Sequence, residues 1–172
     1  MKLKNTGYCS NIKLTIRLPR FINWPCQENE LSDLMRSNKI IRSGNFTFTQ
    51  YLKDRSTLHV TGVKSFREVD GLCDFLSKKI SFTSAELKQN LVINTSTWHL
   101  DIRHKIDLWD LLAQLPKKWQ GKYLPGHFAG LTCKCMSTTA IVFSTGKINF
   151  FGVRKPQDFF RARIAIMQYI FM

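Results

Sequence analysis

Polar and apolar side chains alternate strictly near the start of the chain. Every second residue from Ile12 to Leu18 is aliphatic, whereas the residues between them, from Asn11 to Arg17, are polar. Because successive side chains of a β-strand point to opposite faces, this period of two predicts a strand with one apolar face and one basic face. The same alternation recurs in residues 57–61 and 147–151.

Short segments of this kind follow one another in both halves of the chain, with turn residues between them. Strands are predicted at residues 10–14, 39–42, 46–51, 57–60, 93–96, 131–135, 138–143 and 147–151. Tight turns are predicted at Gly44-Asn45 and at residues 144–146. The opening strand of each half carries an asparagine, Asn11 and Asn94 respectively.

The chain also repeats itself, because residues 61–80 align with residues 151–170 without a gap. Each segment begins with a Gly-Val-basic turn and continues with apolar residues at helical spacing, with Arg163 as a polar exception and Pro156 suited to a first helical turn. Further helices are predicted at residues 28–36 and 106–115, the second ended by Pro116.

The order strand, helix, three strands, helix is therefore predicted twice, with the junction around residues 80–90. Internal repeats of this kind indicate one architecture built from two similar halves. We expect an α+β fold in which repeats 1–88 and 89–172 pair about a pseudo-twofold axis and share one core. The helices would cover one side of an antiparallel sheet and leave the polar side free for a ligand.

The net charge of the chain indicates which class of ligand the polar side of the sheet would bind. Among 172 residues there are 26 Lys and Arg but 12 Asp and Glu, a formal net charge of +14, and 44% of the residues are hydrophobic. Such an excess attracts polyanions and releases counterions from phosphates. A merely soluble basic surface is the alternative. A membrane surface is disfavoured because the cations are spread along the chain and are not gathered on one amphipathic helix. No apolar run is long enough to span a bilayer. The start lacks a signal-peptide pattern, so we expect an intracellular protein.

The residues that carry catalysis or metal binding in other proteins form no recognisable pattern here. The five cysteines, Cys9, Cys26, Cys73, Cys133 and Cys135, contain no CxxC pair and no accompanying pair of histidines. Cys133 and Cys135 share one face of a predicted strand and are interpreted as small buried side chains. Carboxylates are few, and no nucleophile elbow or phosphate-binding glycine loop is present, so we predict neither an enzyme nor a metal or cofactor site.

Three short segments of the second half form a recognisable series: 127–131 (HFAGL), 140–147 (AIVFSTGK) and 152–154 (GVR). They resemble the segments FPGL, IFxSGK and TGAK of the TATA-box-binding protein family. The first half adds 10–12 (SNI) and 60–64 (VTGVK). Together these segments span nearly the whole chain. The resemblance implies a saddle whose curved antiparallel sheet binds an A·T-rich minor groove on its underside and carries helices on its convex face.

The resemblance also assigns roles to individual residues. Phe128 and Phe143 would form a wedge pair that enters between base steps and kinks the duplex. Asn11 and Asn94 would donate to minor-groove acceptors, and Thr61 would contact a base. The cations matched to phosphate contacts are Lys64, Lys147 and Arg154, with Lys13 and Lys134 as weaker candidates, and Asn149 completes the expected DNA-binding set.

The sequence departs from the family pattern at several of these positions. Ala129 replaces a proline, and Phe151 replaces the second base-contacting threonine, where its ring would close the contact or act as another wedge. The first half has no matching wedge phenylalanines. Tyr51 is the nearest candidate for one of them, and Leu34 or Met35 for the other. Residues 125–127 (PGH) stand where the family carries the acidic residue that holds transcription factor IIB.

These features together predict a transcription initiation factor that binds and bends A·T-rich duplex DNA in the nucleus, or in a viral replication compartment if the source is viral. Its expected partners are a transcription factor IIB-like protein and RNA polymerase machinery. Two other readings stay open: a protein-interaction module that kept the fold and lost DNA binding, and a nonspecific basic DNA-packaging protein.

Overall fold

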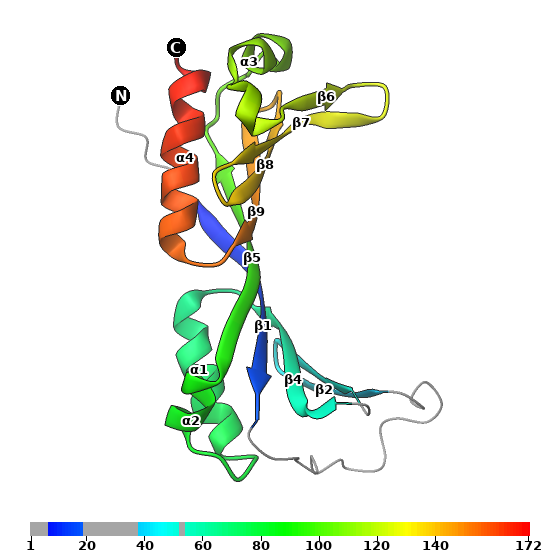
Figure 1. Ribbon diagram of the computed structural model, residues 1–172, viewed down its shortest axis with the longest axis vertical. Helices are drawn as coiled ribbons and strands as arrows, with labels where there is room; N and C mark the ends of the chain where they lie inside the picture. Colours follow the sequence, from blue (N-terminus) through cyan, green and yellow to red (C-terminus); the bar gives the residue numbers. More distant parts are fainter. Residues whose placement is uncertain (1–6, 19–37, 52–53) are drawn as a thin grey trace. The chain divides into compact units, whose positions relative to one another are not determined.

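A computed structural model describes residues 7–18, 38–51 and 54–172 of the chain. In this part of the chain a nine-stranded sheet has the order β2-β3-β4-β1-β5-β9-β8-β7-β6. The strands are β1 (Tyr8–Arg17), β2 (Asn38–Ser43), β3 (Phe46–Tyr51), β4 (Asp54–Val63), β5 (Leu91–Asp101), β6 (Lys122–Leu124), β7 (Phe128–Cys135), β8 (Thr138–Phe143) and β9 (Lys147–Val153). The helices are α1 (Phe66–Ser77), α2 (Ser84–Gln89), α3 (Leu108–Gln114), the 3-10 helix η1 (Lys117–Trp119) and α4 (Pro156–Ile170) (Figure 1).

The chain divides into two compact units. We call Asn11–Asn94 the amino-terminal unit, and Thr95–Met172 with the start of β1 up to Ser10 the carboxy-terminal unit. The strands β1 and β5 each pass from one unit to the other, so the units do not end at the expected repeat boundary between residues 88 and 89. The assignment of residues 1–88 and 89–172 as repeats stays a prediction.

The alternating sequence pattern predicted most of these elements. The strands β3 and β8 have the predicted ends, and β1, β2, β4, β5, β7 and β9 contain their predicted segments but extend further. The expected order of elements was wrong in the second half, where β6 adds a fourth strand after α3. The junction between the halves contains a helix that was not predicted, α2. Three residues of β6 and six of α2 are too few to show a clear period. The helix predicted at residues 28–36 lies outside the described residues.

The core of the carboxy-terminal unit is built around Phe159 of α4, which is fully buried. Its ring stacks on Trp98 of β5 at 4.3 Å between centroids and meets Phe150 of β9 edge to face at 5.2 Å. Helix α4 therefore covers the apolar face of β7, β8 and β9, with Pro156 in its first turn as predicted. Figure 1 shows α4 running along these strands.

The core of the amino-terminal unit has the same plan. Phe48 of β3 is almost fully buried and stacks on Phe75 of α1 at 6.2 Å, and Leu72 and Leu76 of α1 are fully buried. Helix α1 is capped at its start by Ser65, whose hydroxyl accepts from the backbone N–H of Glu68. The helices thus take up the apolar positions of each sheet half, and the polar positions are on the other face.

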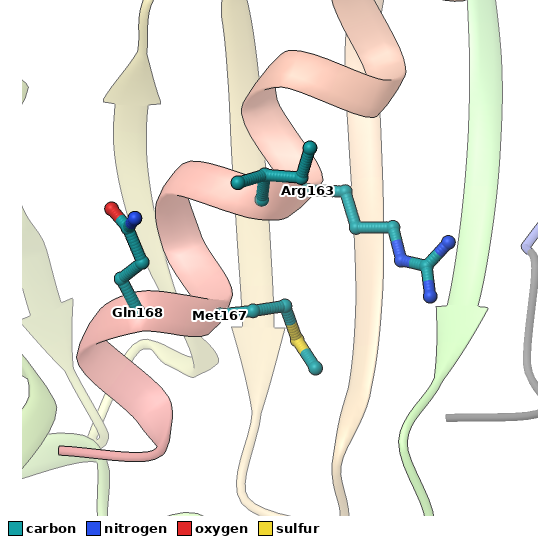
Figure 2. A pocket seen from close by; sticks show the side chains of 4 residues that line it. Arg163, Met167 and Gln168 are labelled. Atoms are coloured by element: carbon teal, nitrogen blue, oxygen red, sulfur yellow. The ribbon is translucent and has the colours of Figure 1, made fainter. Parts of the chain in front are cut away.

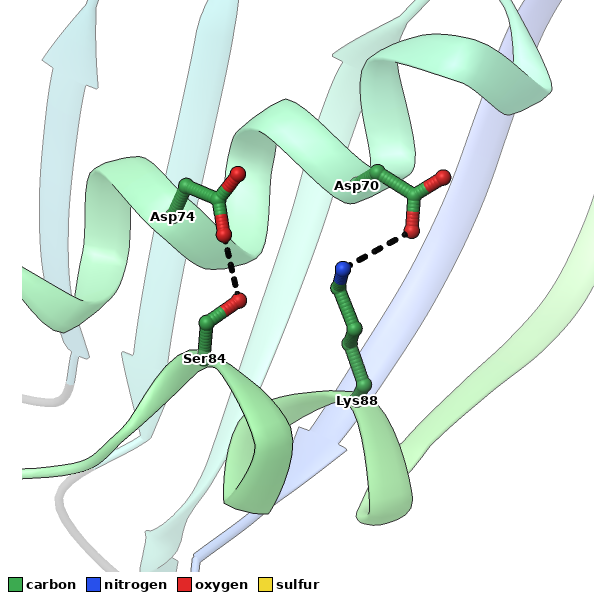
Figure 3. Close-up of polar contacts among 4 residues, drawn as sticks. All are labelled: Asp70, Asp74, Ser84 and Lys88. Atoms are coloured by element: carbon green, nitrogen blue, oxygen red, sulfur yellow. Dashed lines mark hydrogen bonds and ion pairs between the residues drawn. The ribbon is translucent and has the colours of Figure 1, made fainter.

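Helix α2 is tied to α1 by two polar contacts (Figure 3). The Ser84 hydroxyl donates to the Asp74 carboxylate at 2.5 Å, and the Lys88 ammonium lies 3.2 Å from an Asp70 oxygen. This contact with Asp70 raises the pKa of Lys88. A capping box between Thr83 and Glu86 starts the helix.

Candidate nucleic-acid interface

The polar face of the carboxy-terminal unit consists of alternate residues of β7, β8 and β9, and we call it the carboxy-terminal face. Its side chains are half-buried or exposed, apart from the buried Gly130, whereas the residues between them are buried, with Ala129 as the exposed exception. The face is made of Phe128, Gly130, Thr132 and Lys134 from β7, Thr139, Ile141 and Phe143 from β8, and Lys147, Asn149 and Phe151 from β9. The structure thus places all the second-half candidates from these three strands on one face.

Phe128 and Phe143 lie together at one corner of this face. Their ring centroids are 6.0 Å apart and the rings meet edge to face at 66°. Phe128 is 46% exposed although it is a large apolar side chain, and Phe143 is half-buried. Gly130 pairs with Phe143 across the two strands and leaves room for both rings. The two aromatic rings therefore form a surface pair rather than part of the core.

A cross-strand row of the same face carries charge and a third aromatic ring. Lys134 pairs with Thr139, and Thr139 pairs with Phe151. Lys134 is exposed and Phe151 is 37% exposed. Phe151, which replaces a threonine of the family pattern, is thus directed to the surface.

A second row is polar and hydrogen-bonded. His99 of β5 pairs with Asn149 of β9, and its Nδ1 lies 2.7 Å from the Asn149 Oδ1. The Nε2 of the same ring lies 2.7 Å from the hydroxyl of Ser10 on β1. Asn149 also faces Ile141 across β8. Sequence reasoning included Asn149 but missed His99 and Ser10, which lie far from it along the chain.

The amino-terminal unit presents an equivalent polar face, the amino-terminal face. It is made of Asn11, Lys13, Thr15 and Arg17 from β1, Ile40 and Arg42 from β2, Thr47 and Thr49 from β3, and Thr57, His59 and Thr61 from β4. Lys13, Arg17 and Arg42 are exposed. Arg17 and Arg42 were not among the predicted site residues, although the alternation of β1 already placed Arg17 on the polar side.

Strand register shows which positions of the two faces correspond. The row Arg42, Thr47, Thr61 follows the same pairing as Lys134, Thr139, Phe151. Thr61 and Phe151 therefore occupy equivalent positions, as the comparison with the family pattern predicted. The two positions differ in chemistry because one offers a hydroxyl and the other a ring.

The strand register also shows which residue of the first half corresponds to the wedge residue Phe143. Tyr51 pairs with Asn38 as Phe143 pairs with Gly130, so the backbone of Tyr51 is at the position equivalent to Phe143. The other candidates, Leu34 and Met35, lie outside the described residues. Tyr51 as a wedge stays a prediction.

The two predicted asparagines do not occupy equivalent positions, which corrects their pairing. Ile12 pairs with Val63, and Ser96 pairs with Val153, which is the residue equivalent to Val63. The register of each strand pair then shifts by one residue. The residue equivalent to Asn11 is therefore Thr95. The hydrogen bonds of the two side chains support this equivalence. The Asn11 Oδ1 accepts from the Gly62 N–H at 3.4 Å, and the Thr95 Oγ1 accepts from the Gly152 N–H at 3.2 Å.

Asn94 instead corresponds to Ser10. Its Nδ2 donates to the Thr15 Oγ1 at 2.7 Å, and that oxygen lies 3.1 Å from the Nδ1 of His59. Each unit thus holds a three-residue polar row with a histidine in it. The one-residue shift escaped the sequence pattern because it follows from the pairing of β1 with β4 and of β5 with β9, which the alternation along a single strand does not encode.

The cations matched to phosphate contacts are all exposed: Lys13, Lys64, Lys134, Lys147 and Arg154. Within the described ranges, the ion pair that the structure holds joins Lys88 and Asp70 on the helices, away from these cations. Lys147 is opposite Asp101 across β5 and β9, so one carboxylate accompanies this otherwise basic set. Exposed cations of this kind favour contact with an anionic ligand.

Other features of the molecule lie away from the polar faces. A hollow of about 440 Å³ lies on α4, lined by Arg163, Ile164, Met167 and Gln168. Figure 2 shows the Arg163 side chain extending away from the helix. No helix of the described part is long and apolar enough to cross a membrane.

The cysteines of β7 belong to the core, as predicted. Cys133 and Cys135 are buried, and burial raises the pKa of Cys133 to about 12 and that of Cys135 to about 11. Cys26 lies outside the described residues. Among the residues that the structure describes, no three His, Cys, Asp or Glu side chains are close enough to hold a metal ion.

Comparison with known proteins identifies the family of this arrangement. The family model described as transcription factor TFIID, or TATA-binding protein, matches residues 90–171. The TATA-binding protein of Methanococcus jannaschii has a similar structure, with a TM-score of 0.66 over 95% of this chain and 97% of that chain, at 16% sequence identity. No curated protein sequence matches the chain. The family is one of DNA-binding transcription factors and not of enzymes. Residues 90–171 therefore match the TATA-binding protein family by sequence, and over nearly its whole length the chain has a fold similar to that of a TATA-binding protein.

Proposed function

We propose that this chain binds A·T-rich promoter DNA in the minor groove and bends it during transcription initiation. The observation that carries the proposal is the pair Phe128 and Phe143 on the carboxy-terminal face. Full burial of an exposed Phe side chain contributes about 1.5–3 kcal/mol, and a ring left partly exposed forgoes part of this free energy. A ring that inserts between base steps regains this burial when DNA is bound, and minor-groove proteins use such apolar wedges to kink a duplex.

The charges around the pair support the same ligand. Lys134 and Lys147 are on the same face as the rings, and Arg154 follows directly after β9. Such cations hold phosphates and fix register on the duplex without reading sequence. Thr61 and Asn11 of the amino-terminal face supply short polar groups suited to the few hydrogen-bonding groups of an A·T minor groove.

A promoter-binding role would place the chain in the nucleus, or in a viral replication compartment, together with a transcription factor IIB-like protein and RNA polymerase machinery. Residues 125–127 (PGH) precede the wedge strand and are exposed. They supply no carboxylate, so the contact with such a factor would differ from the family pattern.

Gel-shift and bending assays on A·T-rich and G·C-rich duplexes test the proposal. We expect preferential binding and a measurable bend with the A·T-rich duplex, both reduced at least tenfold or abolished by Phe128→Ala and Phe143→Ala. Phe160→Ala is the matched control, because Phe160 on α4 is 45% exposed, close to the 46% of Phe128, but belongs to the helix side. This control variant should bind and bend as the unmodified chain does.

Two outcomes would overturn the proposal in favour of the other readings. Equal affinity for both duplexes with a steep decline between about 50 and 200 mM salt would indicate a nonspecific DNA-packaging protein. No binding to either duplex at low salt would indicate a protein-interaction module that kept the fold.

A further inference from the structure

The polar row Ser10, His99, Asn149 connects three adjacent strands of the carboxy-terminal unit, β1, β5 and β9. Both ring nitrogens of His99 are engaged at 2.7 Å, one by the Asn149 amide and one by the Ser10 hydroxyl. The three side chains are half-buried, so water competes less with these bonds than on an open surface. A row of this kind restricts the orientation of each of its members.

The chemistry of the row decides where the hydrogens are. An amide oxygen accepts hydrogen bonds and cannot donate one, so the Nδ1 of His99 carries the hydrogen that Asn149 Oδ1 accepts. In the neutral ring the Nε2 is then an acceptor, and Ser10 donates to it. The alternative acceptor of Ser10, the carbonyl of Thr97, is more distant at 3.4 Å.

This assignment fixes the orientation of the Asn149 amide. Its oxygen is directed to His99, and its NH2, a double donor, is the part of the amide that takes no part in this row. An A·T pair presents acceptors alone in the minor groove, namely adenine N3 and thymine O2, whereas a G·C pair adds the guanine amino group as a donor. A fixed donor thus matches A·T and opposes the guanine amino group.

We infer that Asn149 is a specificity-determining residue for minor-groove binding and that His99 is the positioning residue that fixes its amide. The inference rests on the DNA-binding function proposed above. The inferred role applies to the carboxy-terminal unit alone. In the amino-terminal unit His59 occupies the position equivalent to Asn149, because His59 pairs with Thr15 as Asn149 pairs with His99. Ile141 beside Asn149 adds an apolar neighbour that disfavours water at this position.

The test uses inosine to isolate the effect of one minor-groove group, the guanine amino group, on the affinity for DNA. Inosine·cytosine and guanine·cytosine pairs differ by the guanine amino group in the minor groove, and an inosine·cytosine pair presents the acceptors of an A·T pair there. An A·T-rich duplex is prepared with one pair replaced by inosine·cytosine or by guanine·cytosine, and the replacement is moved along the site. Affinities are measured for the unmodified chain and each variant.

For the unmodified chain we expect one position where guanine·cytosine binds about tenfold more weakly than inosine·cytosine. This difference should fall to less than about twofold in Asn149→Ala and in His99→Leu. His99→Asn should restore it, because an asparagine amide offers a donor near the place of Nδ1. His104→Leu is the matched control for a histidine away from the face, and it should keep the full difference.

The possible failures are distinguishable. If the unmodified chain binds no A·T-rich duplex, the proposed function fails and this inference fails with it. If the chain binds and discriminates, but Asn149→Ala and His99→Leu discriminate equally well at every position, the proposed function stands and the role of Asn149 is refuted. Retained discrimination in His99→Leu with loss in Asn149→Ala would refute the positioning role, and circular dichroism of each variant identifies any that has not folded.

Discussion

Gly130 is directly opposite Phe143 across β7 and β8, and a Cβ at Gly130 would lie 3.1 Å from that ring. The same atom would lie 2.9 Å from the Phe128 ring and 2.7 Å from the Ile141 side chain. These distances are shorter than ordinary van der Waals contacts. The two rings can therefore pack against each other on the carboxy-terminal face because the residue beneath them has no side chain.

The first prediction concerns this glycine. Gly130→Val should displace both rings, since the added atoms have no free space, and should lower affinity for A·T-rich DNA at least tenfold. Overpacking of this kind also costs about 1–3 kcal/mol of stability. Gel shifts and thermal unfolding measure the two effects. Gly126→Ala is the control, because nothing lies within 4 Å of a Cβ there; equal DNA binding by Gly130→Val and the control would contradict the wedge.

The second prediction concerns phosphate contact by Arg154. Each phosphate contact contributes about 0.9 to the slope of log affinity against log salt concentration. Arg154→Gln should therefore weaken binding to all duplexes alike and reduce this slope by about one. Titrations at several salt concentrations with Lys79→Gln as a control test it, since Lys79 follows α1 and belongs to neither polar face. An unchanged slope in Arg154→Gln would remove this residue from the interface.

The third prediction concerns the core beneath α4. Phe159→Ala should lower the free energy of unfolding by about 3–5 kcal/mol, because it leaves a cavity between Trp98 and Phe150. The neighbouring Phe160→Ala should cost far less, since its ring is 45% exposed. Urea denaturation of both variants gives the comparison. Similar losses in both would show that α4 is not anchored through Phe159.

The fourth prediction concerns the thiols of β7 and the dependence of stability on pH. The folded chain holds the pKa of Cys133 at about 12 and that of Cys135 at about 11, above the ordinary value of 9.0. Between about pH 9 and 11 the unfolded chain therefore binds fewer protons than the folded chain, and stability falls as pH rises. Their stabilising contribution is complete below pH 9.

Denaturant unfolding at several pH values tests this dependence. A variant with Cys133→Ala and Cys135→Ala should show a weaker decline above pH 9 than the unmodified chain. In addition, iodoacetamide at pH 8 should modify both thiols slowly in the folded chain and quickly after unfolding. Rapid modification of both in the folded chain would contradict their burial.

The sequence by itself determined most of the sheet and of the carboxy-terminal face. Alternation of polar and apolar residues depends on local backbone geometry alone, so it placed Lys147, Asn149 and Phe151 on one side of their strand. It also placed Cys133 and Cys135 together on one face of theirs, whereas the family resemblance indicated the exposed position of Phe143. The basic excess indicated the class of ligand, because net charge needs no structure to be known.

Tertiary structure decided the relations between strands that are distant in the chain. The pairing of β1 with β4 and of β5 with β9 sets the register, so Thr95 rather than Asn94 corresponds to Asn11. The joining of Ser10, His99 and Asn149 into one row depends on the pairing of three strands, which no local pattern encodes. The alternation of a strand assigns each side chain to a face, but hydrogen bonding between strands decides which side chains meet there.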